Sequence, residues 1–190
     1  MDKADVGWLP LYITEDSWGP NTNIAGCSSS PPFTQACLDT ASAFAARSLV
    51  LAAFSGVAAY YWYAWGNSTH GTLYDTSTGL LNEAGVAYKE VRAWLAGATS
   101  TSPCTHSQTV YTCAFGRTAG FEGLIVWDTA QTCKASGCST STYRVPIGYT
   151  TRYDLAGDAP VTLGSTTQIG AKPILLANYR CSVTAPMCGG

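Results

Sequence analysis

Apolar residues in the first half of the chain form two short continuous runs, with a longer apolar stretch between them. Residues 9–14 (LPLYIT) and 57–62 (VAAYYW) have the length and composition of β-strands that are buried on both faces. Residues 34–54, between these runs, predict a long and mostly apolar helix that ends before Gly56. The chain therefore begins with the pattern strand, helix, strand.

A second helix is predicted after the second strand, because apolar side chains return at helical spacing. Asn82 suits the N-cap of this helix, and Gly97 suits its C-terminal stop. Between these two residues, four apolar positions fall on one helical face: Ala84, Tyr88, Val91 and Leu95. An order of strand, helix, strand and helix predicts that the two strands are parallel.

The second half of the chain has a different pattern. Residues 97–103 (GATSTSP) form a Ser- and Thr-rich stretch that ends in Pro and is typical of a linker. Short β-rich runs follow, separated by turn residues, at 109–115, 122–127, 141–145, 150–155, 160–163 and 172–177. This pattern indicates an antiparallel sheet or sandwich. We therefore expect an α/β plus β protein, with an α/β segment over residues 1–98 and a β domain over residues 104–190.

Composition narrows the classes of partner. Hydrophobic residues make up 46% of the 190 residues and charged residues only 12%, about half of the usual ~25%. The net charge is -2, whereas nucleic-acid binding requires a basic surface. The chain has no block of like charge and no apolar run that we expect to span a membrane. We therefore expect neither nucleic acid nor membrane as a partner.

The 8 cysteines lie in near-neighbour pairs: Cys27 and Cys37, Cys104 and Cys113, Cys133 and Cys138, Cys181 and Cys188. Pairing within these neighbours would close four short loops, although spacing alone leaves other connectivities open. Zinc is the alternative, but no pair has the two-residue spacing of a zinc knuckle and the chain has only 2 histidines. We therefore expect disulfides, no metal, and a secreted, extracellular protein.

The first residues, MDKAD, are charged and lack the apolar stretch of a signal peptide. A disulfide-rich chain is normally exported, so we expect that an N-terminal portion precedes this sequence.

Glu15 follows directly on the first predicted strand. A carboxylate at the carboxyl end of a parallel strand lies on the face where α/β barrels hold their active sites. Glu15 is therefore a candidate catalytic residue. Capping or ion pairing within the following loop is the alternative role.

Aromatic residues gather at the end of the second strand, in the stretch YYWYAWGN over residues 60–67. Such rings can stack on the apolar faces of sugars, although strands also take aromatic residues for core packing. Trp65 lies beyond the strand in a polar loop and is the strongest candidate for substrate contact. Trp62 and Trp18 are further candidates.

Three phrases in this order carry a resemblance to a known family: PLYITEDSWG, AAYYWYAWGN and TGLLNEAGVAYKEVRAWLAG. Together they resemble the last two βα units of the clan of retaining (β/α)8 glycoside hydrolases that includes many cellulases and β-xylosidases. The resemblance implies that Glu15 is the nucleophile and that Trp65, or Trp62, forms the floor of a sugar subsite. Residues 85–95 match the helix that closes the barrel, and residues 161–176 are similar to the closing strands of a C-terminal β domain.

The resemblance implies a double-displacement reaction. One carboxylate attacks the anomeric carbon, and a second carboxyl group about 5–5.5 Å away protonates the leaving oxygen. In the family the second group ends the fourth strand, whereas this chain has two of the eight strands. The carboxylates in the chain are weak substitutes for it: Asp16, Asp75, Glu122 and Asp128. We therefore expect the second carboxyl group and the other barrel strands to come from self-association or from a missing N-terminal barrel portion.

Three functions remain in competition. The chain is all or part of a hydrolase that acts on β-linked oligosaccharide or polysaccharide, without a cofactor. Alternatively, it is a non-catalytic carbohydrate-binding protein that uses the aromatic residues, or a disulfide-stapled β module whose α/β segment is only a scaffold.

Overall fold

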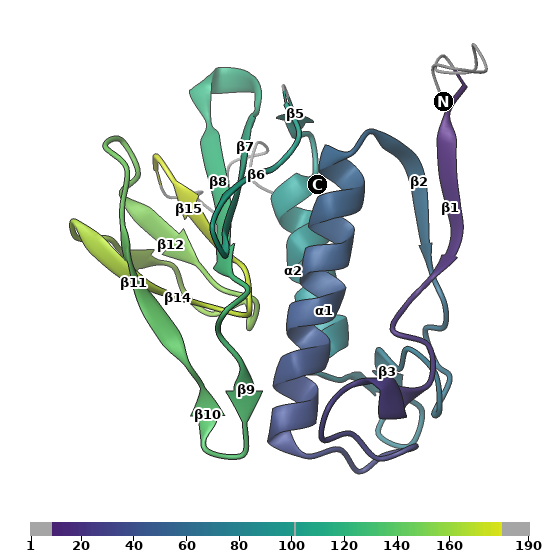
Figure 1. Ribbon diagram of the computed structural model, residues 1–190. Coiled ribbons are helices and arrows are strands. Elements are labelled where there is room, and N and C mark those ends of the chain that lie inside the picture. Colours follow the sequence, from purple (N-terminus) through teal and green to yellow (C-terminus); the bar gives the residue numbers. More distant parts are fainter. Residues whose placement is uncertain (1–8, 101, 180–190) are drawn as a thin grey trace.

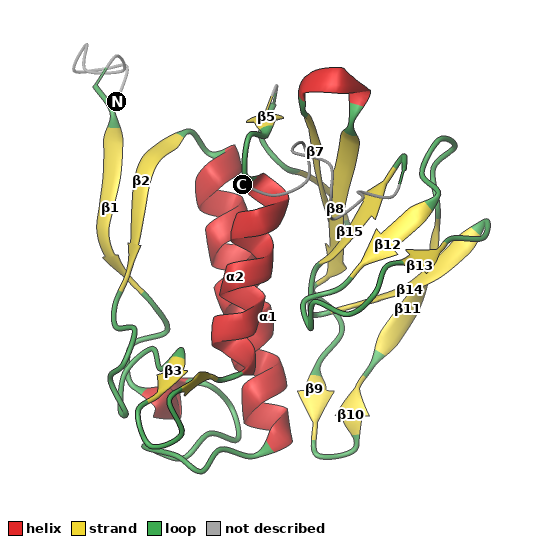
Figure 2. Ribbon diagram, turned by 180° about the vertical axis from the view of Figure 1, so that it is seen from behind, coloured by secondary structure: helices red, strands yellow, loops and turns green. Residues whose placement is uncertain are grey.

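The computed structural model describes residues 9–100 and 102–179. The elements form layers (Figure 1). A pair of parallel strands lies on one side, two helices form the centre, and a larger antiparallel sheet lies on the other side. Figure 2 shows the two helices between the two sheets from behind.

The parallel pair consists of β1 (Leu11–Asp16) and β2 (Val57–Trp62). The predicted strand positions and their parallel order are confirmed. The expectation that both strands are buried on both faces is wrong, since Tyr12 is 55% and Tyr61 is 57% exposed. Within the described residues, β1 and β2 pair only with each other, so no further strand or second layer covers the outer face.

The first helix, α1 (Gln35–Phe54), matches the predicted range, and its N-cap is Thr34, whose side chain accepts a hydrogen bond from the backbone N–H of Cys37. The helix is apolar on most sides because it contacts α2, β2 and the hairpin of β9 and β10. Among the described residues, α1 is the one helix whose length and apolarity would allow it to cross a membrane, and 56% of the apolar stretch is buried inside the protein.

The second helix, α2 (Glu83–Leu95), begins and ends as predicted. The Asn82 side chain caps it by accepting a hydrogen bond from the backbone N–H of Gly85 at 3.0 Å. Gly97 has a φ of 65°, a left-handed conformation that suits glycine after a helix. A 3-10 turn (Asn21–Asn23) follows β1, and the small strands β3 (Tyr74–Asp75) and β4 (Leu80–Leu81) lie between β2 and α2.

The larger sheet has the order β13-β12-β15-β8-β7-β5, and β6 also pairs with β7. All its pairs are antiparallel, as predicted. Its strands are β5 (Thr99–Ser100), β6 (Thr105–Ser107), β7 (Val110–Gly116), β8 (Glu122–Asp128), β12 (Thr151–Tyr153), β13 (Val161–Thr162) and β15 (Ile174–Ala177). A 3-10 turn (Thr118–Gly120) joins β7 and β8.

Two further strand pairs extend the β region. β11 (Thr140–Arg144) pairs with β14 (Thr166–Gly170), and a short hairpin joins β9 (Cys133–Lys134) and β10 (Gly137–Cys138). The sequence pattern does not predict β14 or this hairpin. Residues 99–100, predicted to lie in a linker, form β5 at the edge of the larger sheet.

The main hydrophobic core lies between the two helices and the larger sheet. It contains fifteen buried residues: Ala46, Leu49, Val50, Phe54, Ala87, Val91, Trp94, Cys113, Phe115, Phe121, Ile125, Trp127, Leu155, Leu175 and Ala177. Residues from both predicted segments therefore share one core. On the far face of the sheet, Leu124, Val126, Ile169, Ile174 and Leu176 form a smaller core, to which β14 contributes Ile169.

Three disulfides join neighbouring cysteines as the spacing suggested: Cys27–Cys37, Cys104–Cys113 and Cys133–Cys138. Cys181 and Cys188 lie outside the described residues.

Candidate functional site

Glu15 lies at the carboxyl end of β1, one residue before the strand ends. The register changes just before it, because Ile13 pairs with Tyr60 whereas Asp16 pairs with Trp62. Three steps along β1 thus match two steps along β2, which is the signature of a β-bulge. In a regular register Glu15 would lie opposite Trp62. The bulge instead gives that place to Asp16 and turns Glu15 toward the opposite face.

The Asp16 side chain is held against the helix layer. Its Oδ2 accepts hydrogen bonds from the Ser48 hydroxyl of α1 and from the Tyr60 hydroxyl of β2, both at 2.8 Å. Since successive side chains on a strand point in opposite directions, Glu15 points away from α1. Glu15 is exposed, and no group within the described residues donates a hydrogen bond to it.

Burial raises the pKa of the Tyr60 hydroxyl well above its usual range, and the hydrogen bond and negative charge of Asp16 add to this effect. Tyr60 therefore stays protonated and acts as a donor to Asp16. No local pattern predicts this cluster, because Asp16, Ser48 and Tyr60 lie on three different elements.

Trp65 follows β2 by three residues and is 49% exposed. Its ring stacks on Tyr74 of β3, with 6.3 Å between ring centroids and 18° between ring planes. The Trp65 carbonyl accepts hydrogen bonds from the backbone N–H groups of Leu73 and Tyr74, at 3.2 and 3.0 Å. The structure thus holds an exposed aromatic surface at the same end of the parallel pair as Glu15.

Trp62 and Trp18 lie in a different environment. Trp18 is only 7% exposed, and its indole N–H donates to Asn21 Oδ1 at 3.0 Å. Trp62 packs edge-on against Trp18, with 5.1 Å between ring centroids, and donates its indole N–H to the Gly71 carbonyl at 2.7 Å. The rings of Trp18 and Trp62 are less exposed to solvent than the ring of Trp65, because both side chains pack into the core beside α1.

Two residues that no sequence motif marks, Asn21 and Gly71, join the loop after β1 to the loop after β2. Asn21 is buried, and its Nδ2 donates to the Ser68 carbonyl and to the Thr72 hydroxyl, both at 3.0 Å. The backbone N–H of Gly71 donates to the Gly19 carbonyl at 3.0 Å. These hydrogen bonds hold together the loops that follow β1 and β2, next to Glu15.

The weak acid/base candidates have other surroundings. Hydrogen bonds from Ser77 lower the pKa of the Asp75 carboxyl. Burial alone would raise the pKa of Asp128, but hydrogen bonds from Ser141, Gln131 and the Ala130 backbone hold it below its usual range. A general acid needs a raised pKa, so neither Asp75 nor Asp128 has the character of one. Glu122 is exposed on β8, in the larger sheet.

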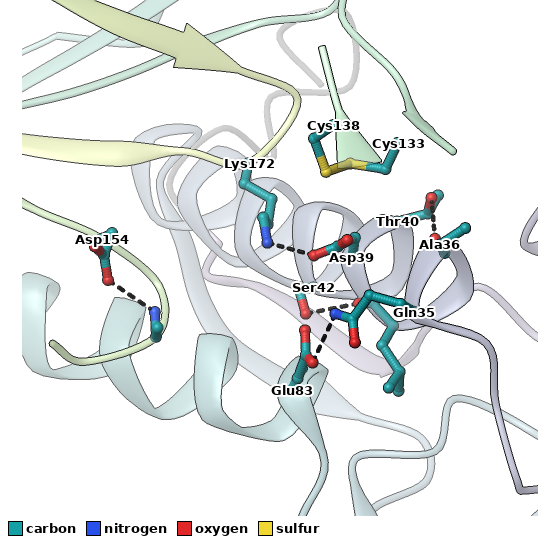
Figure 3. A network of polar contacts seen from close by, with 12 residues as sticks. Gln35, Ala36, Asp39, Thr40, Ser42, Glu83, Cys133, Cys138, Asp154 and Lys172 are labelled. Carbon is teal, nitrogen blue, oxygen red and sulfur yellow. Dashed lines mark hydrogen bonds and ion pairs between the residues drawn. A yellow bond between two sulfur atoms is a disulfide. The ribbon is translucent and has the colours of Figure 1, made fainter. Parts of the chain in front are cut away.

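One group in the described part of the chain has metal-ligand distances: Asp39 with the sulfurs of Cys133 and Cys138. The two sulfurs form a disulfide, as Figure 3 shows. Metal binding by cysteine requires thiolates, so this group does not offer the ligands of a metal centre.

No protein-family model and no curated protein matches the sequence. Comparison with solved structures does find similar folds. One is a family 39 glycoside hydrolase from the gut symbiont Bacteroides cellulosilyticus WH2, with a TM-score of 0.62 and 17% sequence identity over 88% of this chain. Another is a family 30, subfamily 8 xylanase from Clostridium acetobutylicum, with a TM-score of 0.49 and 12% identity, covering 93% of this chain and 44% of that one.

The chain spans 33% of the length of the family 39 structure. Its fold is therefore similar to a part of a glycoside hydrolase.

Proposed function

We propose that this chain is the C-terminal part of a secreted retaining β-glycoside hydrolase, in which Glu15 is the nucleophile. The observation that carries this proposal is the β-bulge beside Tyr60 and Trp62. It presents an exposed carboxylate, with no partner among the described residues, at the carboxyl end of a parallel strand, the usual place of catalytic groups in α/β barrels.

In the proposed reaction, a Glu15 oxygen forms an ester bond to the anomeric carbon while the glycosidic C–O bond breaks. The leaving oxygen takes a proton from a second carboxyl group, and water later cleaves the ester. We propose that this second group lies on polypeptide outside the chain, since none of Asp75, Glu122 and Asp128 has a fitting environment or position.

The exposed face of β1 and β2 supports the same proposal. A two-stranded parallel pair with an apolar outer face needs further strands to cover it. The rest of a barrel, or other copies of this chain, would supply these strands. Three disulfides support an extracellular location.

The test uses a glycoside with an activated leaving group that needs no acid catalyst. A 2,4-dinitrophenyl 2-deoxy-2-fluoro-β-glycoside is incubated with the intact chain, and the mass of each peptide is then measured. We expect one glycosyl group on Glu15, no label on Glu15→Gln, and normal labelling of the control variant Glu122→Gln. Label on another carboxylate, with none on Glu15, would contradict the role of Glu15.

A second function is favoured by the Trp65–Tyr74 stack alone. A non-catalytic carbohydrate-binding protein would use this exposed aromatic surface without turnover. Retention on insoluble polysaccharide that is lost in Trp65→Ala, while Glu15→Gln still binds, would support this alternative. If the chain shows neither activity, only the scaffold interpretation remains.

A further inference from the structure

A cleft of about 280 Å³ lies in the β region, lined by residues of β10, β11, β12, β14 and β15 and of the turns that follow β12 and β14. The two helices lie between β1 and the strands that line this cleft (Figure 1), so it is distinct from the Glu15 site. Its volume is near the lower end of the range for ligand pockets, ~300 Å³. Its polar side chains include Arg152, Asp154, Gln168 and Lys172.

Arg152 is the unusual residue in this cleft. It lies on β12 between Thr151 and Tyr153; Thr151 is buried and Tyr153 packs against the main core, so Arg152 points to the opposite face of the sheet. Its Nε is buried and has no acceptor among the described residues. A buried guanidinium N–H without an acceptor is costly. An anionic group in the cleft would be attracted by the positive charge of the same guanidinium.

Lys172 adds a second cation. Its Nζ donates to Asp39 Oδ1 at 2.5 Å, as Figure 3 shows. An ammonium group has three N–H donors, so two of them are available to a ligand. Arg152 and Lys172 together therefore favour a carboxylate group in the cleft.

The cleft also offers acceptors, which a simple anion would not use. Asp154 accepts a hydrogen bond from the backbone N–H of Ala156 at 3.1 Å through one oxygen, which leaves the other oxygen as an acceptor. Gln168 donates through Nε2 to the Thr142 hydroxyl at 3.1 Å, which leaves its carbonyl oxygen as an acceptor. Sugar hydroxyl groups match such acceptors. Leu155, Pro173 and Ile174, which are almost fully buried, also line the cleft.

We infer that this cleft binds a sugar that carries a carboxylate, that is, a uronic acid residue of an acidic polysaccharide. The carboxylate follows from Arg152 and Lys172 and the hydroxyl groups follow from Asp154 and Gln168. Only the choice of a carbohydrate ligand rests on the proposed function.

The experiment titrates the intact chain with D-glucuronate, D-glucose and acetyl-diglycine, followed by isothermal calorimetry or NMR shifts. We expect glucuronate to bind at least ~10-fold more tightly than the other two probes, since each of them lacks one half of the match. Arg152→Met should weaken glucuronate binding by about 10-fold or more. Arg144→Met removes the same charge from an exposed position on β11 outside the cleft and should leave binding unchanged.

Stability separates this role from a structural one. Arg152→Met removes a buried donor that has no protein acceptor, so its midpoint of thermal unfolding should equal or exceed that of the parent chain. A clear loss of stability would overturn the inference, as would equal binding of glucose or of acetyl-diglycine. Glu15→Gln should bind glucuronate normally, so the cleft and the proposed catalytic role succeed or fail separately.

Discussion

The Tyr60 hydroxyl donates a hydrogen bond of 2.8 Å to the Asp16 carboxylate, across the two strands of the parallel pair. Ser48 of α1 donates to the same oxygen. One carboxylate thus ties the end of β1 to both its partner strand and the helix layer. Because Asp16 follows Glu15 directly, this cluster also fixes the backbone that carries the proposed nucleophile.

Replacement of Asp16 by Ala should therefore destabilise the protein by about 1–3 kcal/mol, because two partly buried hydroxyl groups lose their common acceptor. Denaturant unfolding of the intact chain measures this change. Asp158→Ala, at an exposed position, is the control and should change the free energy of unfolding by less than about 0.5 kcal/mol. An equal effect of the two substitutions would contradict the anchoring role.

The raised pKa of Tyr60 predicts a loss of stability at high pH. The unfolded chain releases this proton near pH ~10, whereas the folded chain retains it. The stability that Tyr60 contributes to the folded state is therefore fully present below about pH 10 and declines as the pH rises above this value. Unfolding curves between pH 9 and pH 11, taken as a rough range around that value, should show a smaller decline for Tyr60→Phe.

Tyr12→Phe is the matched control for that pH series, because Tyr12 is exposed and should leave the decline as it is. The pKa values of Tyr88, Tyr143 and Tyr149 are also raised by burial, so part of the decline should persist in Tyr60→Phe. An unchanged pH dependence in Tyr60→Phe would show that Tyr60 does not contribute.

Gly71→Ala should be severely destabilising. A Cβ at this position would collide with the Tyr63 carbonyl oxygen and with the Ser17 side chain, and the φ of Gly71 is +54°. We expect a cost of about 3 kcal/mol in denaturant unfolding. Gly26→Ala is a sharp control, since Gly26 also has a positive φ but a Cβ there meets nothing within 4 Å. Its cost should be about 1 kcal/mol.

The Asp39–Lys172 pair joins α1 to the β region and predicts a non-additive double substitution. Lys172→Met leaves the buried Asp39 carboxylate without its cation and should cost about 1–3 kcal/mol, a value reduced because the Lys172 side chain is 37% exposed. Adding Asp39→Leu should recover much of this loss. Additive losses in the double-substitution cycle would show that the pair is not coupled.

The open face of β1 and β2 predicts self-association of the isolated chain. Tyr12→Lys combined with Tyr61→Lys should shift sedimentation velocity toward the monomer, since both side chains are exposed on this pair. Ile147→Lys is the control, because Ile147 is an exposed apolar residue in the β region. A compact monomer of the parent chain at high concentration would contradict this prediction of self-association.

The sequence predicted the elements whose signals are local. The position of α2 could be predicted because Asn82 and Gly97 mark its two ends, and β2 because its apolar run is short and continuous. The strand β14 could not, because Ile169 is its one buried apolar residue and its polar neighbours suggest a loop. It is a strand because β11 supplies its hydrogen-bond partners.

The candidate site shows the same limit. Glu15 and Trp65 could be selected because each follows a recognisable strand. The sequence could not show which of three tryptophans is exposed, because that depends on the helices that cover Trp18 and Trp62. It also could not show the bulge before Asp16, which depends on the register with β2.

The main core has a consequence for how this chain can be divided. Val50 of α1 and Val91 of α2 are buried together with Ile125 of β8, so the helices and the larger sheet complete one another. A cut within residues 97–103 would therefore leave two fragments with bare apolar surfaces, and each would aggregate when expressed alone. The two helices and the larger sheet form a single folding unit.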